Sequence, residues 1–281
     1  MLKVTVLAIL VVSLISCQKD IKPDNTPVDK NLLLVKAVTK FKEDSFAYSF
    51  QYNASAQLIE EDFIESWQGA KDTAQTSIGR NSEGIIQVLS YKSSQLRKLG
   101  FDDFTYNVIY DETQATYVAK VAYYTIKDSS YRDSVVFTSN SSKQIVTEEL
   151  FSTSGSPTGG YAPAGKKEYV YDNNGNVIER KEYSNKNSTK EYKLTLSYKN
   201  QYDAKQAPIT LGAEAIVVGD VQFAPTNNPV KTTYTDNVRA SNNYNSTTGY
   251  TFNADNWPIT ATVNYEGGTT SLVTTYAYQA P

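Results

Sequence analysis

Acidic side chains are the groups in this sequence best suited to chemistry, because histidine is absent and cysteine occurs once. Without imidazole, the sequence excludes Ser-His-Asp and Cys-His nucleophiles and His-bearing zinc sites. Paired carboxylates of the kind that glycosidases use occur at 60–62, followed by Glu65, and at 148–149. In a strand Glu60 and Asp62 share one face, and exposed strand acids also discourage edge pairing. We therefore expect no catalytic residue and a protein that is not an enzyme.

A run of oxygen-bearing residues, Asp-Asn-Asn-Gly-Asn at 172–176, partly resembles a calcium-binding loop. It lacks the bidentate Glu that closes such a loop. The same residue types are typical of a tight hairpin turn. The sequence predicts a turn here, with no metal site and no cofactor.

Aromatic side chains dominate the remainder, with 22 Tyr, 10 Phe and 2 Trp. We expect most tyrosines to pack in the core and in cross-strand pairs, while a concave tyrosine-lined sheet offers a surface for a glycan or a peptide. Trp257, Trp67 and Tyr250 are the candidate binding residues. Trp257 immediately precedes Pro258 in a polar turn, so it either contacts a ligand or folds back over the sheet edge.

The N-terminus contains one positive charge, Lys3, and then an apolar run that is too short to span a bilayer as a permanent helix. Its end, Leu-Ile-Ser-Cys at 14–17, resembles the lipobox of bacterial lipoproteins. That resemblance implies that residues 1–16 are a signal peptide and that Cys17 is acylated to become the first residue of the mature protein. As the sole cysteine, Cys17 leaves no disulfide available.

Residues 17–31 hold the lipidated cysteine and a polar, proline-bearing linker. The Gln-Lys-Asp that follows Cys17 resembles the short signal that sends Bacteroidota lipoproteins to the cell surface. This implies an outer-membrane, lipid-anchored protein that faces outward. Removal of 1–16 takes away Lys3 and leaves a net charge of −4, so nothing basic invites nucleic acid.

From residue 32 onward, period-two alternation rich in Tyr, Phe, Val, Ile and Thr indicates strands separated by Asn, Asp, Gly and Ser turns. One unit recurs: an aromatic residue, five mostly polar residues, and an apolar or proline pair. It begins at Tyr52, Tyr171, Tyr202 and Phe252, with looser copies at Tyr91, Tyr110 and Phe137. The repeats predict a chain of hairpins that bury a shared aromatic face.

The segment that begins Tyr169-Val-Tyr-Asp-Asn-Asn-Gly-Asn-Val-Ile resembles the YD/Rhs-type repeat. The order of motifs over 166–281 is similar to that of Bacteroidota lipoproteins of unknown function that carry a YD-repeat-like domain. The resemblance implies fold and location and brings no activity. In the first half of the body, Ser and Ala replace the Gly of the turns.

The fold expected for 32–281 is all-β, an antiparallel meander of hairpin repeats in a twisted or curled sheet. A Gly, Pro and Ser-rich stretch at 152–165 is a protruding loop or a joint between subdomains. The family pattern makes 212–228 an insertion between two strands, with a short helix as one form.

Three functions remain open. The leading one is a non-enzymatic lipoprotein that acts as a surface or outer-membrane interaction module, with the membrane as partner through its anchor and a protein or glycan partner at the cell surface. The second is a periplasmic carrier of a lipid or other apolar ligand in a curled sheet, which requires a cavity lined by Val, Ile, Leu and Phe. The third is a carboxylate-dependent glycan hydrolase, which needs two converging acids.

Overall fold

The structure, a computed structural model, describes residues 32–126, 129–153, 162–185, 191–268 and 271–281. The predicted signal peptide and linker, including Cys17, lie outside these ranges. Most of the candidate joint at 152–165 lies outside them as well. The strands on either side of that joint, β9 and β10, pair directly with each other in one sheet.

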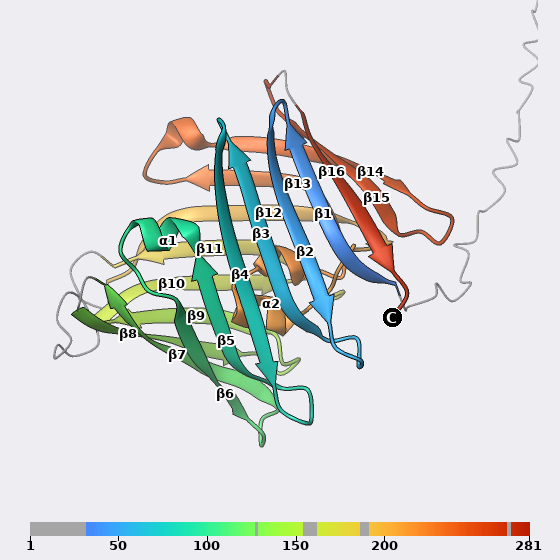
Figure 1. Ribbon diagram of the computed structural model, residues 1–281. Helices are drawn as coiled ribbons and strands as arrows, with labels where there is room; N and C mark the ends of the chain where they lie inside the picture. Colours follow the sequence, from blue (N-terminus) through green and yellow to red (C-terminus); the bar gives the residue numbers. More distant parts are fainter. Residues whose placement is uncertain (1–31, 127–128, 154–161, 186–190, 269–270) are drawn as a thin grey trace, which may run out of the picture. The chain divides into compact units, whose positions relative to one another are not determined.

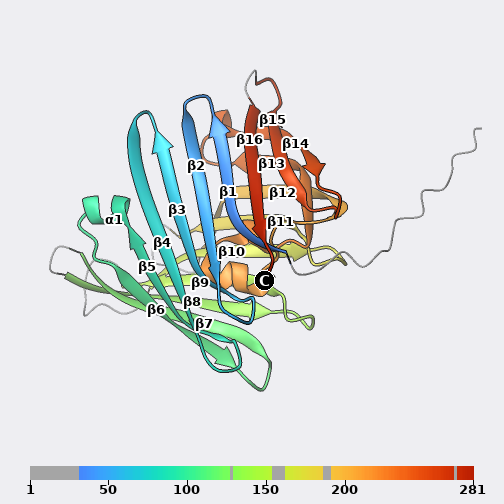
Figure 2. The ribbon, with the colours of Figure 1, turned by 45° about the vertical axis from the view of Figure 1, so that its right-hand side comes forward.

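The strands form one closed antiparallel barrel in which every strand pairs with its neighbours in sequence and β1 pairs with β16 (Figures 1 and 2). The prediction of an open, twisted or curled sheet is therefore wrong, because Leu33 to Lys40 of β1 lie against Val273 to Gln279 of β16. Closure removes both free edges of the sheet. The strands are β1 Leu33–Phe41, β2 Asp44–Tyr52, β3 Leu58–Trp67, β4 Ala70–Arg80, β5 Ile86–Ser93, β6 Phe104–Asp111, β7 Thr116–Ile126, β8 Ser129–Ser139, β9 Ile145–Ser152, β10 Ala162–Tyr171, β11 Val177–Ser184, β12 Lys193–Gln206, β13 Asn227–Asp236, β14 Tyr244–Phe252, β15 Pro258–Tyr265 and β16 Ser271–Gln279.

Five hairpin turns at one end of the barrel share a single geometry. In each of the five, the side-chain oxygen of an Asn or Asp accepts hydrogen bonds from the backbone N–H groups two and four residues later, and the fourth residue of the turn has a positive φ. The turn between β6 and β7 differs, because Asp111 accepts from the N–H groups two and three residues later. The capping residues are Asn53, Asn81, Asn140, Asp172 and Asn253. The predicted turn at 172–176 is confirmed.

The repeat pattern also placed two turns wrongly. Tyr202 does not precede a hairpin turn, because β12 continues to Gln206. Tyr91 precedes Ser93, which caps the short helix α1 (Ser94–Lys98) at the opposite end of the barrel. Asn81 follows Arg80 rather than an aromatic residue, so the pattern missed its turn.

Five tyrosines on even-numbered strands have a structural role. Each donates its hydroxyl to a backbone carbonyl near the start of the preceding strand, where pairing is irregular next to the turn. The bonds run from Tyr52 to Leu34, Tyr171 to Ile145, Tyr202 to Val177, Tyr250 to Pro229 and Tyr278 to Pro258, over 2.6 to 3.0 Å.

Residues 207–226, here called the plug, connect β12 to β13 and enter the barrel (Figures 1 and 2). They hold helix α2 (Ala213–Val218) and the 3-10 turn η1 (Val221–Phe223), so the predicted insertion with a short helix is confirmed. Ala215, Ile216 and Val217 are at most 1% exposed and pack in the hydrophobic core. The plug thus packs apolar side chains inside one end of the barrel.

Successive residues of each strand face the lumen and the outside in alternation. On β2, Tyr48 and Phe50 contact Phe223 of the plug, so these alternate residues face the lumen. The register pairs Phe50 with Glu61, which places Glu60 and Asp62 on the outer face. Among the described residues, no helix is long and apolar enough to cross a membrane.

Candidate binding site in the barrel lumen

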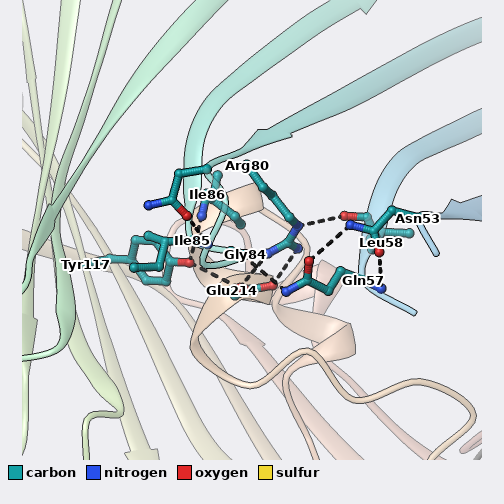
Figure 3. A network of polar contacts seen from close by, with 10 residues as sticks. Asn53, Gln57, Leu58, Arg80, Gly84, Ile85, Ile86, Tyr117 and Glu214 are labelled. Atoms are coloured by element: carbon teal, nitrogen blue, oxygen red, sulfur yellow. Dashed lines mark hydrogen bonds and ion pairs between the residues drawn. The ribbon is translucent and has the colours of Figure 1, made fainter. Parts of the chain in front are cut away.

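The plug is fixed to the barrel wall by a buried ion pair (Figure 3). Arg80 of β4 makes two parallel bonds of 2.8 Å to the carboxylate of Glu214 on α2, and the Tyr117 hydroxyl donates to the same carboxylate. Arg80 also donates to the carbonyls of Leu58 and Gly84. The two-pronged geometry fixes the orientation of α2 as well as its position.

A second attachment involves charges that are buried more deeply. The Lys120 ammonium, on the inner face of β7, donates to the Val217 carbonyl at the C-terminal end of α2 over 2.6 Å. Burial lowers the pKa of Lys120 to about 8. Opposite it, Glu61 of β3 is hydrogen-bonded to Asp220 of the plug, and burial raises the pKa of both carboxyls, that of Glu61 to about 9.

Each carboxyl, once ionised, raises the cost of ionising its partner, and burial raises the pKa of both. Near neutral pH, Glu61 and Asp220 therefore share a proton. The pair holds the plug and has no room between its carboxyls for a glycosidase water.

Two cavities are lined by residues of both the plug and the barrel wall. One, of about 250 Å³, is lined by Arg180, Tyr198 and Asn200 on the wall and by Val221 and Gln222 on the plug. The other, of about 290 Å³, carries charged side chains from the inner wall: Lys120, Glu148, Lys167 and Glu182. Within the lumen Lys167 pairs with Glu148 and Arg180 pairs with Glu182, so the walls are polar but nearly neutral.

Aromatic side chains surround the end of the barrel opposite the plug, here called the mouth. Because the strands are antiparallel, the connections from odd- to even-numbered strands meet at the mouth, while the plug joins β12 to β13 at the other end. Three aromatic groups line the inner wall there, and members of each are only partly buried. They are Phe41, Phe46, Phe63 and Trp67; Tyr91, Phe104, Tyr124 and Tyr131; and Tyr198, Tyr234, Tyr244 and Tyr265.

The structure separates the three predicted binding residues. Trp67, 41% exposed, belongs to the mouth and stacks on Phe41. Trp257 is 3% exposed and packs on Tyr278 at the plug end, with its ring inside the wall. Tyr250 faces the lumen at the plug end, and its hydroxyl donates a hydrogen bond to the Pro229 carbonyl. Only Trp67 presents an accessible aromatic face.

The predicted acidic pairs do not converge. Glu60 and Asp62 face outward and bind Gln51 and Gln75 on neighbouring strands. Glu148 faces the lumen and accepts from the Tyr169 hydroxyl, while Glu149 pairs in register with outward Lys166. Within the described ranges, no group of three or more His, Cys, Asp or Glu side chains is arranged to hold a metal ion.

Sequence reasoning missed the residues that build the floor of the lumen, including Arg80, Lys120 and Glu214. One signal was present: the apolar run 215–218 is bracketed by Glu214 and Asp220, which is unusual in an exposed loop. The strand residues that meet them are not marked by any local pattern.

No known family model matches the chain, and no curated protein matches it. Among solved structures, a porin-like protein from Bacteroides vulgatus is 13% identical with a TM-score of 0.53, covering 89% of this chain and 99% of that one. The likeness is one of fold. A porin-like protein from Bacteroides uniformis is 10% identical with a TM-score of 0.49, covering 88% of this chain and 96% of that one.

Proposed function

We propose that the protein is a non-enzymatic, lipid-anchored binding module of the outer membrane, whose barrel stands in water and takes its ligand through the mouth. The observation that carries this proposal is the polarity of the outer face of the barrel wall. The lipobox at 14–17 supports the anchor, and the resemblance to Bacteroidota surface lipoproteins supports the outer membrane as its location. The porin-like description of the B. vulgatus structure fits the same membrane.

Charged side chains on the outer face argue against a barrel embedded in lipid. Lys166 pairs with Glu168 over 2.8 Å, and Glu179 lies within 3.3 Å of Lys181 and 3.6 Å of Lys199, all facing outward from β10 to β12. A Lys or Arg on the lipid face costs about 2 to 4 kcal/mol at the bilayer midplane. Several such groups on adjacent strands suit a surface in water.

Apolar residues also occur on the outer face, but polar ones interrupt them. Val136 of β8 is 42% exposed and pairs with Glu149 of β9. Ile109 of β6, 48% exposed, has outward Asn107 two residues before it on the same strand. A membrane barrel carries instead a continuous outward apolar band between aromatic girdles.

The lining of the mouth favours a binding module over a carrier of lipid. The carrier requires an aliphatic cavity, whereas the accessible wall here is built from Tyr, Phe and Trp with amides and charged groups beneath. Aliphatic side chains such as Ile216 and Leu89 are buried in the core around the plug and do not line an open cavity. The hydrolase is favoured least, because the acids of the 60–62 run point to opposite faces.

Fractionation of cells that express the full chain with Cys17→Ala tests the proposal. We expect the wild-type protein to sediment with membranes until detergent is added, and the variant to be recovered in the soluble fraction. Ser13→Ala, outside the 14–17 motif, is the matched control and should behave as wild type. A variant that stays in the membrane after an alkaline wash would show that the barrel itself is embedded.

A further inference from the structure

We propose that the mouth binds a saccharide chain, whose sugar rings stack on four tyrosines of the inner wall, here called the tyrosine row. The row consists of Tyr198, Tyr234, Tyr244 and Tyr265. This inference rests on the proposed function, because it takes the mouth of the lumen as the binding site.

The row crosses four adjacent strands, β12 to β15, at the mouth. Ring centroids are 4.9 Å apart from Tyr198 to Tyr234, 4.9 Å from Tyr234 to Tyr244, and 5.2 Å from Tyr244 to Tyr265. Arg180 lies 3.9 Å from the Tyr198 ring and extends the row onto β11. The result is a continuous aromatic surface that is long enough for more than one ring of a ligand.

The hydroxyl groups of the row differ from those of the tyrosines at the plug end. There, Tyr202, Tyr250 and others each donate to a backbone carbonyl. Among the described residues, no hydrogen bond partner exists for the hydroxyls of the row. Tyr244 is 36% exposed. The row therefore offers ring faces and unpaired hydroxyls at an accessible surface. Packing of the barrel does not explain either feature.

Polar groups stand beside the row in the 250 Å³ cavity. Tyr198 and Arg180 form one side, and Asn200, Thr232 and Gln222 contribute amide and hydroxyl groups. A sugar has an apolar C–H face that packs on an aromatic ring and hydroxyls at its edge that need donors and acceptors. The juxtaposition of the row and this cavity satisfies both needs, as binding sites generally combine apolar area with a few orienting polar groups.

Other ligand classes fit less well. The side chains of Asn200, Thr232 and Gln222 already bond within the protein. An alkyl chain would, however, cover the hydroxyls of the tyrosine row and leave them without hydrogen-bond partners. Nucleic acid stacks on aromatic rings too, but it also needs positive charge, and the lumen cations Arg180 and Lys167 are paired with carboxylates in a chain of net charge −3.

Titration calorimetry on the intact lipoprotein, in a detergent without a sugar headgroup, tests the inference. The probes are linear oligosaccharides of glucose, mannose and xylose, with palmitate as the apolar comparison. We expect at least one oligosaccharide to bind, and Tyr234→Ala and Tyr244→Ala to weaken it roughly tenfold, the scale of one lost aromatic stacking partner. Tyr123→Ala, an exposed tyrosine on the outer face of β7, should leave affinity unchanged.

Two further variants separate the loss of ring stacking from misfolding. Tyr234→Phe and Tyr244→Phe keep the rings and should retain most of the affinity. Binding of palmitate alone, or saccharide binding that is insensitive to both alanine variants, would overturn the inference. So would the failure of every oligosaccharide to bind. Anchoring is measured separately by fractionation of Cys17→Ala. None of these results would therefore contradict the proposal of a lipid-anchored barrel in water.

Discussion

At the scale of single residues, the Arg80–Glu214 ion pair makes a clear prediction. The Arg80 side chain is 6% exposed and that of Glu214 is 29% exposed. Arg80→Ala leaves the Glu214 carboxylate without its cation inside the barrel, so we expect a loss of about 2 kcal/mol in the free energy of unfolding, less than for a fully buried pair. Urea unfolding measures it.

The matched control is Arg97→Ala, which breaks an ion pair of the same type with Asp103 on the surface. Since both of those side chains are largely exposed, stability should hardly change. Equal losses for the two variants would mean that the plug is not held by its ion pair.

Glu61 makes a pH-dependent prediction. Its pKa is about 9 in the folded protein and 4.5 ordinarily, so between these values the folded state binds more protons than the unfolded state. Stability contributed by protonated Glu61 is complete below pH 4.5 and is lost as the pH rises towards 9.

Thermal unfolding at pH values from about 5 to 7, below the pKa of Lys120, measures this loss. We expect the wild-type protein to become less stable across the interval, and Glu61→Gln to reduce the slope. An identical slope in the variant would place the protonated carboxyl elsewhere.

At the scale of elements, the repeated turns allow a matched comparison. Gly84 and Gly175 occupy the same turn position, with φ of 84° and 85°. A Cβ at Gly175 would meet nothing closer than 3.6 Å, whereas a Cβ at Gly84 would lie 2.0 Å from the Gln57 amide, which bonds Asn53.

We expect Gly175→Ala to cost about 1 kcal/mol, from the left-handed backbone alone. Gly84→Ala should cost about 1 kcal/mol more, because Gln57 must give up its hydrogen bond. Chemical denaturation of both variants tests this. The added cost should vanish when Gln57→Ala is already present, and a persisting difference would contradict the explanation.

Element prediction succeeded where the information was local. The turn capped by Asp172 and the insertion after β12 follow from Asn, Asp and Gly spacing and from an apolar run in a polar context. The binding residues were harder. Trp67 and Trp257 look alike in sequence, and only the register and the turn geometry place one at the mouth and the other in the core.

At the scale of the whole molecule, closure could not be predicted. The pairing of β1 with β16 joins residues some 240 positions apart, such as Thr39 and Thr274, whose hydroxyls bond over 2.8 Å. Alternation defines two faces of each strand but not how many strands complete a ring. It also does not say which face is enclosed, so the same repeats fit an open meander.

Closure makes a prediction of its own. Deleting 269–281 removes β16 and leaves the edges of β1 and β15 unpaired, so we expect aggregation. Deleting only Ala280 and Pro281, which lie beyond the strand, should leave a monodisperse protein. Size-exclusion chromatography with light scattering distinguishes them. A monodisperse 1–268 chain would mean that the β1–β16 seam is dispensable.

The hydrogen-bonded seam between the first and last strands has a topological consequence. Because Leu33 pairs with Gln279, the two ends of the barrel domain emerge side by side, and the ring has no privileged starting strand. A short loop could join them while the chain is cut at another hairpin, such as Asn140 to Gln144. Such a circular permutant should rebuild the same barrel, with any tether moved to a different point on its circumference.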